Sequence, residues 1–364
     1  MPKWKLYPTT DEGGPAMNAT TYAVDIAKSV FHVHWVEPET GEIHNRKLSR
    51  AKFSAFIAQR QPGRIVMEAC GSAHYWGRTF MALGHQVELL PAFEVHKRVI
   101  GNKDDCADAA AIWLTAQSAT VRRVPVKTVQ QQADLTVHRV RSQLVRERTA
   151  RVNALRGLLY EFGVVMPKGR RLGLRWLADN RAQIEQRLPE RMQRLVQLQL
   201  DTLRQLDEHI EVLEAEVKEM VSTSELARRL IKVPGLGCLS ASAGASLVGD
   251  ASGWRNARQF ACCLGLEPSH VGTGGKVRMG PISKRGDAYL RTLLIHGARN
   301  LVRTAAPSQW IARMLERRPF NVVATAVAHK LARIMWAMAA HGREYDPNWL
   351  SQAPHAKAAS TAAA

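Results

Sequence analysis

The order of elements expected over residues 21–125 constrains the fold more than any other feature of this chain. Three short β-prone segments come first, and helices then alternate with two further strands. The expected strands are Thr21–Ala27, Phe31–Val36, Ile43–Leu48, Arg64–Glu68 and Gln86–Leu90. The expected helices are Ala51–Arg60, Ala73–Leu83 and Asp105–Ala119. This order, β-β-β-α-β-α-β-α, predicts a mixed α/β sandwich.

Composition divides the rest of the chain into four segments. We expect a flexible tail over residues 1–20 and a disordered, low-complexity tail over residues 351–364. Residues 126–225 are expected to form a helical, coiled-coil and RNA-binding region, and residues 226–350 a mostly helical C-terminal domain. Over Pro189–Val221, apolar residues recur at spacings of three and four. That repeat predicts a coiled coil, either within a long antiparallel hairpin or as a dimer arm.

The chain is strongly basic, with 51 Lys and Arg against 32 Asp and Glu and a net charge of +19. This surplus predicts a polyanionic partner, with nucleic acid first and an anionic membrane surface second. Residues 121–175 hold 13 basic against 3 acidic residues, and residues 251–350 hold 15 against 5. Two separate basic surfaces favour a protein that holds more than one nucleic-acid segment, whereas a solvated helix face is the alternative. The candidate contacts on the first surface are Arg139, Arg141, Arg146 and Arg148.

A membrane or secreted protein is not expected. The most apolar stretch, Val322–Ala340, is interrupted by His329, Lys330 and Arg333. The N-terminal segment has no apolar signal region. The five cysteines are an odd number without framework spacing, which predicts reduced thiols in a cytosolic protein.

Acidic residues stand at mid-strand, at a strand end and at a helix start. Asp25 lies in the first strand, Glu68 ends the fourth, and Asp105 and Asp108 share one face of a helix. Each alone has an ordinary explanation, as an edge residue or as a favourable charge at a helix start. Their order together resembles the ribonuclease H-like fold, in which such acids converge on one or two metal ions. Oxygen ligands without a Cys/His set point to Mg²⁺ or Mn²⁺ rather than zinc.

A glycine-rich stretch, Gly272–Gly286, lies in the expected C-terminal domain. Its glycines around Thr273 leave backbone N–H groups free to approach a phosphate closely. Its basic residues are Lys276, Arg278, Lys284 and Arg285. A hydroxyl there could attack a phosphodiester and form a covalent protein–DNA bond. The alternative is a flexible basic loop that only clamps the nucleic-acid backbone.

A short motif, VPGLG over Val233–Gly237, resembles the turn of a helix-hairpin-helix. In such turns the glycine amides grip a DNA backbone without reading its sequence. Gly235 and Gly237 are therefore candidate nucleic-acid contacts.

Six motifs, in this order and spacing, carry a resemblance to one family. They read YAVDIAK, IVMEACGS, GNKDDCADA, VPGLG, FACCLGLEPSHVGTGGKVRMGPISKRGD and LLIHGAR. Over nearly all of residues 21–345 the chain resembles the DEDD-type transposases of the IS110 insertion-sequence family, whose relatives are bridge-RNA-guided recombinases and Piv-type DNA invertases. The resemblance implies a ribonuclease H-like (RuvC-like) domain, a coiled coil and a C-terminal transposase domain, so the expected fold class is α/β plus α.

The resemblance also implies roles for single residues. Asp25, Glu68, Asp105 and Asp108 match the family's DEDD metal ligands. The family motif often reads K-T-D-x-x-D-A, and here Asp104 replaces the threonine.

Thr273 stands where the family has its nucleophilic serine. A threonine keeps the hydroxyl and adds a methyl group, so attack should be slower or need a roomier site. Ser269 is the second candidate nucleophile, and an impaired copy is the third possibility.

The mechanism that the resemblance implies is guided DNA recombination in the bacterial cytoplasm, in association with the nucleoid. A structured guide RNA pairs with donor and target DNA, and the protein reads shape and phosphate. Dimers pair into a tetramer, with the acids from one subunit and the hydroxyl from another. Two other functions stay open: a metal-dependent Holliday-junction-type nuclease without strand transfer, and a non-catalytic nucleic-acid-binding protein.

Overall fold

The computed structural model describes residues 20–99, 104–273, 276–304 and 308–346. Two compact units follow one another along the chain, with the boundary between Val129 and Gln130. Residues 1–19 and 351–364 of the expected tails lie outside the described part. The finer division into segments that the sequence suggested stays a prediction.

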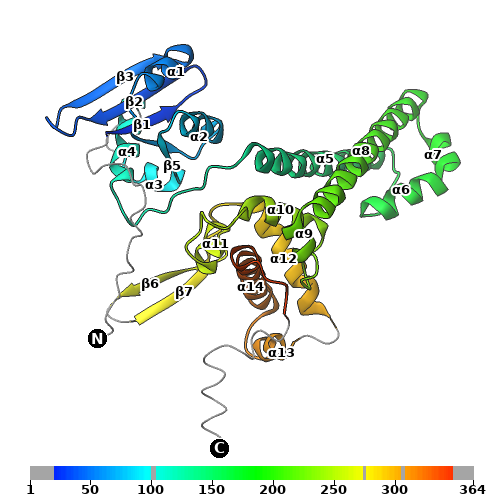
Figure 1. Ribbon diagram of the computed structural model, residues 1–364. Helices are drawn as coiled ribbons and strands as arrows, with labels where there is room; N and C mark the ends of the chain where they lie inside the picture. Colours follow the sequence, from blue (N-terminus) through cyan, green and yellow to red (C-terminus); the bar gives the residue numbers. More distant parts are fainter. Residues whose placement is uncertain (1–19, 100–103, 274–275, 305–307, 347–364) are drawn as a thin grey trace, which may run out of the picture. The chain divides into compact units, whose positions relative to one another are not determined.

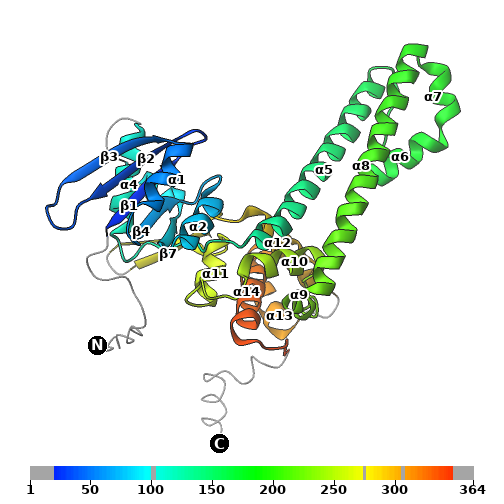
Figure 2. The same cartoon turned by 45° about the horizontal axis from the view of Figure 1, so that its top comes forward.

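The first unit contains a five-stranded mixed sheet in the order β3-β2-β1-β4-β5 (Figure 1 and Figure 2). Its strands are β1 Thr21–Ile26, β2 Val30–Val36, β3 Ile43–Ser49, β4 Arg64–Glu68 and β5 Gln86–Leu90. β1, β2 and β3 pair antiparallel, whereas β1, β4 and β5 run parallel. All five expected strands form, and this topology is consistent with a ribonuclease H-like fold.

Helices cover both faces of this sheet, because its strands alternate between two sets of buried residues. On one face, Phe31 of β2 stacks on Phe53 and meets Trp76 edge-on. Those two aromatic residues come from α1 (Arg50–Ala58) and α2 (Ala73–Ala82). On the other face, Ala23 and Val66 pack against Ala111 and Ile112. The helix on this second face is α4, Asp105–Ala116.

One helix of the first unit was not expected. The chain forms a single turn, α3, over Ala92–His96 after Pro91. Five residues are too few to show a helical repeat in the sequence, and proline pre-sets the backbone at a helix start.

The second unit begins with two long helices that run side by side in opposite directions, α5 and α8 (Figure 2). They span Val129–Tyr160 and Glu190–Thr223, and the short helices α6 (Arg170–Asp179) and α7 (Arg181–Arg187) connect them. Val152, Leu155 and Leu159 of α5 share a core cluster with residues of α8 such as Met192 and Val196. A long antiparallel hairpin was one of the two arrangements expected from the repeat over Pro189–Val221, and whether the seam between the helices is a true coiled coil stays a prediction.

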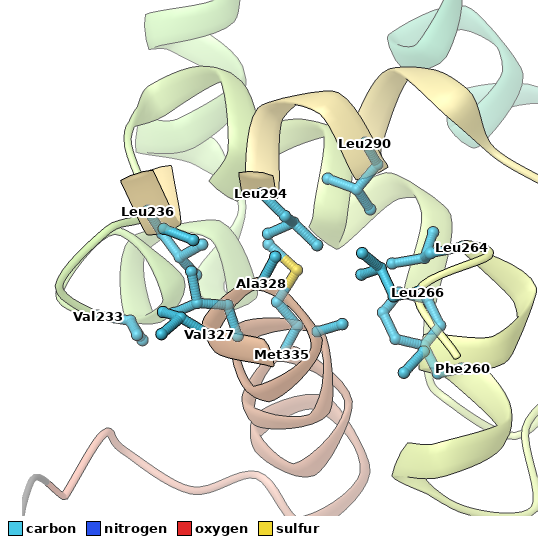
Figure 3. Packing of buried hydrophobic residues seen from close by; sticks show 14 of the residues in the cluster. Val233, Leu236, Phe260, Leu264, Leu266, Leu290, Leu294, Val327, Ala328 and Met335 are labelled. Atoms are coloured by element: carbon cyan, nitrogen blue, oxygen red, sulfur yellow. The ribbon is translucent and has the colours of Figure 1, made fainter. Parts of the chain in front are cut away.

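The C-terminal part of this unit packs around α14, Phe320–His341 (Figure 3). The helices around it are α9 Glu225–Leu230, α10 Cys238–Val248, α11 Ala257–Cys263, α12 Ala288–Arg303 and α13 Gln309–Leu315. By length and composition α14 could cross a membrane. However, Val327, Ala328 and Met335 are buried in the core of this unit, which explains the helix's apolar character without a membrane.

The glycine-rich stretch, expected as a loop, forms a β-hairpin in its described residues. Whether it only clamps the nucleic-acid backbone or carries the nucleophile stays a prediction. β6 (Pro268–Thr273) pairs antiparallel with β7 (Lys276–Ile282), with a register shift near His270. Val271 and Ile282 are β-branched residues, which favour strands. The density of glycine hid this pattern in the sequence.

Candidate active site

The candidate active site of the first unit is built at the carboxyl ends of β1 and β4. These strands are adjacent and parallel, so their ends lie at the same edge of the sheet. Asp25 follows Ala23 by two residues, and Glu68 follows Val66 by two. Since residues two apart in a strand share a face, both acids lie on the face that α4 covers.

The first turn of α4 completes the acidic cluster. Ligand oxygens of Asp25, Asp105 and Asp108 all lie within 4.8 Å of one another. The fourth predicted acid, Glu68, stands outside that tight group, but the charges of Asp25 and Asp108 still act on its carboxyl. Asp104 does not belong to this cluster. It is the N-cap of α4 and accepts a hydrogen bond from the Cys106 amide at 3.4 Å. The extra acid in the family motif thus caps the helix.

Burial and mutual repulsion disfavour the ionised form of these carboxylates when no cation is bound. Burial raises the pKa of Asp25, and the neighbouring Asp108 and Asp105 raise it further. Burial likewise raises the pKa of Glu68, followed by the charges of Asp25 and Asp108. Burial, then Glu68 and Asp25, also raises the pKa of the Cys70 thiol to about 11.

The donor set fits a hard divalent cation. Among the residues that the structure describes, no lysine or arginine forms an ion pair with these acids, and the ion-pair partner of Asp105 is a histidine, His32. Carboxylate oxygens that converge without a lysine or arginine are the ligands that Mg²⁺ and Mn²⁺ prefer. The cluster can therefore hold such an ion.

The hairpin of the second unit carries the predicted hydroxyls. The backbone of Thr273 pairs with Lys276 at the end of β6, and its side chain lies outside the described part. Ser269 is exposed, and its hydroxyl donates to the carbonyl of Pro281 across the hairpin at 3.0 Å. Lys276 and Arg278 are exposed on β7.

The base of the hairpin is anchored to the core of the second unit. Glu267, next to β6, accepts hydrogen bonds from Arg258 of α11 at 3.0 Å and from His329 of α14 at 3.1 Å. These partners outweigh burial and hold the pKa of Glu267 below its usual value. Lys284 and Arg285 lie shortly after the end of β7, and both are exposed.

Comparison with known proteins decides the family. Residues 22–163 match the IS110-type DEDD transposase model, and residues 227–313 match the model described as transposase IS116/IS110/IS902 family. A probable family 20 transposase of Pseudomonas aeruginosa is 45% identical over 337 residues, which cover 91% of this chain and 100% of the relative. The chain belongs to the IS110/IS116/IS902 transposase family.

Further relatives agree with that assignment. The transposase for insertion sequence element IS1111A of Coxiella burnetii is 37% identical and aligns with 88% of this chain and 90% of its own. The transposase for insertion sequence element IS1328 of Yersinia enterocolitica is 36% identical, with 89% and 98% covered. This protein is therefore an insertion-sequence transposase, an enzyme that acts on DNA.

The predicted basic residues on α5 of the transposase fall into two kinds. Arg139 and Arg146 are exposed. Arg141 pairs with Glu214 of α8, and Arg148 with Asp207 of α8 at 2.6 Å. The second pair of arginines therefore joins the two long helices, and nucleic-acid contact by all four stays a prediction.

The VPGLG turn of the transposase packs against α12. Gly235 has φ +88°, a conformation that favours glycine, and a Cβ on Gly297 would lie 1.9 Å from its carbonyl oxygen. The amide of Gly237 donates to the Ser240 hydroxyl at 2.9 Å. The turn thus has a structural role, and DNA contact by either turn glycine stays a prediction.

Sequence reasoning missed one residue beside the acids. His32 of β2 stands directly opposite Asp25 of β1 in the sheet register. Its Nε2 lies 3.3 Å from Oδ2 of Asp105. The signal was present, because a short connection between two antiparallel strands places a residue of the second strand beside Asp25.

Proposed function

We propose that this transposase is a divalent-metal-dependent recombinase that uses Asp25, Glu68, Asp105 and Asp108 as its metal ligands. The observation that carries the proposal is the convergence of three carboxylates, from β1 and α4, within 4.8 Å. Mg²⁺ or Mn²⁺ is the expected ion, because all donors are carboxylate oxygens. When bound, such an ion supplies positive charge to the phosphoryl group that reacts.

The protein's own residues supply the rest of the chemistry in this proposal. The hydroxyl of Thr273 attacks a DNA phosphorus atom and forms a threonine–phosphate ester. The bond from phosphorus to one deoxyribose oxygen breaks, that oxygen takes up a proton, and the threonine proton is lost to solvent. Attack by a new DNA hydroxyl reverses these bonds and releases the protein, which completes strand exchange.

The basic surfaces account for the partners that we propose. They are donor DNA, target DNA and a structured guide RNA, whose base pairing supplies the sequence choice. The exposed cations of α5 and of the hairpin, among them Arg139, Arg146 and Arg278, are suited to the phosphates of these molecules. The acids and the hydroxyl belong to different compact units, which is compatible with a composite site in a dimer or tetramer. The bacterial cytoplasm, at the nucleoid, is where these partners would be met.

The test compares two neighbouring acids in recombination between plasmids that carry the element's ends and its RNA. Asp108→Asn should abolish product, because a neutral amide oxygen is a much weaker ligand than a carboxylate. Asp104→Asn is the matched control, since asparagine caps a helix as well as aspartate does. Full activity in Asp108→Asn would overturn the metal role.

The nucleophile has its own test, a denaturing gel that detects protein bound covalently to labelled DNA. Thr273→Ala should remove the adduct, whereas Ser269→Ala should keep it. An adduct that survives Thr273→Ala and disappears in Ser269→Ala would transfer the role to Ser269.

A second function is favoured by one observation, the threonine at the position of the family's serine. If that hydroxyl does not react, the acids alone would make a metal-dependent junction nuclease. Hydrolysed DNA ends that depend on Asp108, without any covalent adduct, would identify this activity.

A further inference from the structure

A buried histidine faces the acidic cluster with an unsatisfied ring nitrogen. His32 is 9% exposed, and its Nε2 atom has no hydrogen-bond partner within the described part of the chain. The same atom lies 3.3 Å from Oδ2 of Asp105, which is near enough for an ion pair but not aligned for a hydrogen bond. A buried polar atom without a partner costs free energy, so this nitrogen needs a hydrogen-bond partner.

The opposite side of the ring indicates which nitrogen carries the proton. Nδ1 of His32 lies 3.8 Å from Sγ of Cys106, within reach of a weak hydrogen bond to sulfur. If the thiol donates to Nδ1, the ring hydrogen sits on Nε2 and is directed at Asp105. The side chain of Asp105 is 64% exposed, so packing alone does not fix its orientation.

We infer that His32 is a positioning residue, which donates a hydrogen bond from Nε2 to the Asp105 carboxylate while that carboxylate binds the metal ion. The inference rests on the metal centre proposed above. His32 is not one of the ligands, because the group within 4.8 Å consists, among the described residues, of Asp25, Asp105 and Asp108. It fixes the orientation of one ligand, and such outer partners typically change metal affinity by about 10–100-fold.

A second histidine on the same strand provides a matched control. His34 lies on the same face of β2 as His32, two residues further on, and is also buried. Its Nδ1 lies 2.8 Å from Oδ1 of Asn45, and its ring meets Trp113 edge-on. It therefore has partners of its own away from the three clustered acids.

The experiment titrates Mn²⁺ alone into the full-length protein and measures free Mn²⁺ by electron paramagnetic resonance. His32→Phe keeps the ring volume without a donor and should weaken Mn²⁺ binding about 10–100-fold. His32→Gln places an amide donor near the position of Nε2 and should recover most of the affinity. His32→Asn places its amide near Nδ1 instead and should resemble His32→Phe. His34→Phe should bind Mn²⁺ with an affinity within about twofold of wild type, because the hydrogen-bond partner of His34 is Asn45 and not a metal ligand.

The outcomes separate this inference from the proposed metal centre. Wild-type affinity in His32→Phe, or equal affinity in the Gln and Asn variants, would overturn the inference alone. Binding that is absent in wild type, or unchanged in Asp25→Asn, would overturn the metal centre and the inference together. Thermal melting of each variant identifies any that fails to fold. If His32→Phe does not fold, the comparison of Mn²⁺ affinity between His32→Gln and His32→Asn tests the inference.

Discussion

The acidic cluster and the β-hairpin are constructed in opposite ways. The acids extend from strands and a helix whose other residues form a core, and Ala23 and Val66 beside them are fully buried. The hairpin has only two strands, and Val271 and Met279 on it are 71% and 61% exposed. Packing therefore fixes the strand and helix positions from which the acids extend, whereas the described hairpin keeps its surface available for another molecule. Substitutions should act on chemistry in the first region and on binding in the second.

The largest effect is expected at Asp25. Asp25→Asn should reduce recombination below detection, because it removes a central ligand. The unfolding free energy should stay equal or rise, because burial and the charges of Asp108 and Asp105 disfavour the ionised carboxyl. Thermal melting without added metal, beside the recombination assay, measures both. A variant that is inactive because it has unfolded would contradict this view of the site.

The second effect tests how the exposed hairpin is anchored. Gly286 follows β7 with φ +78°, and a Cβ there would lie 1.7 Å from the carbonyl oxygen of Cys263. Gly286→Ala should therefore lower the unfolding free energy of the second unit by about 2–5 kcal/mol, from backbone strain and overpacking.

Gly342→Ala is the control for that substitution. Gly342 has φ +61° and nothing within 4 Å of its ideal Cβ, so only the backbone strain of about 1–2 kcal/mol remains. Urea unfolding of both variants gives the comparison. If both variants lose the same unfolding free energy, the close approach of a Cβ at position 286 to the Cys263 carbonyl oxygen does not affect stability.

The sequence predicted the first unit better than the second, for a physical reason. Strands such as β1 and β4 are recognisable in the sequence as runs of apolar residues. Because the two strands are parallel, their terminal acids are expected at the same edge of the sheet. The hairpin has no core of its own, so glycine and cations obscured its alternation. The place of His32 opposite Asp25 follows from the short strand connection, but its contact with Asp105 joins residues that are distant in sequence and meet only through the fold.

The third effect concerns a buried histidine, His138, which holds helices together and lies outside the proposed metal centre. His138 of α5 is 1% exposed, with Nε2 3.0 Å from the Ser242 hydroxyl and Nδ1 3.1 Å from the Tyr289 hydroxyl. Ser242 donates to the carbonyl of Cys238, so it accepts from Nε2–H, and Tyr289 then donates to Nδ1. This neutral ring joins α5 to α10 and α12.

Protonation should loosen that junction. Burial, and secondly Arg141, lowers the pKa of His138 from 6.5 to about 4. Below pH 6.5, His138 is therefore protonated in the unfolded chain, whereas in the folded chain it stays neutral down to about pH 4. The unfolding free energy of the second unit should fall by up to about 3 kcal/mol between pH 7 and pH 4. Urea unfolding of wild type and His138→Gln measures this, and an equal pH dependence in both would exclude His138 as its source.

The smallest effect is expected at the exposed cations of the hairpin. Arg278→Gln and Lys276→Gln each remove a charge that packs against no core, so melting temperatures should not change. Each should weaken binding to any DNA duplex by about the same factor, and reduce the slope of log affinity against log salt by about 1. Arg141→Gln is the informative comparison, because that arginine pairs with Glu214 between the two long helices. It should lower the melting temperature while changing the salt slope less, and the reverse pattern would show that charge on α5, rather than on the hairpin, holds the nucleic acid.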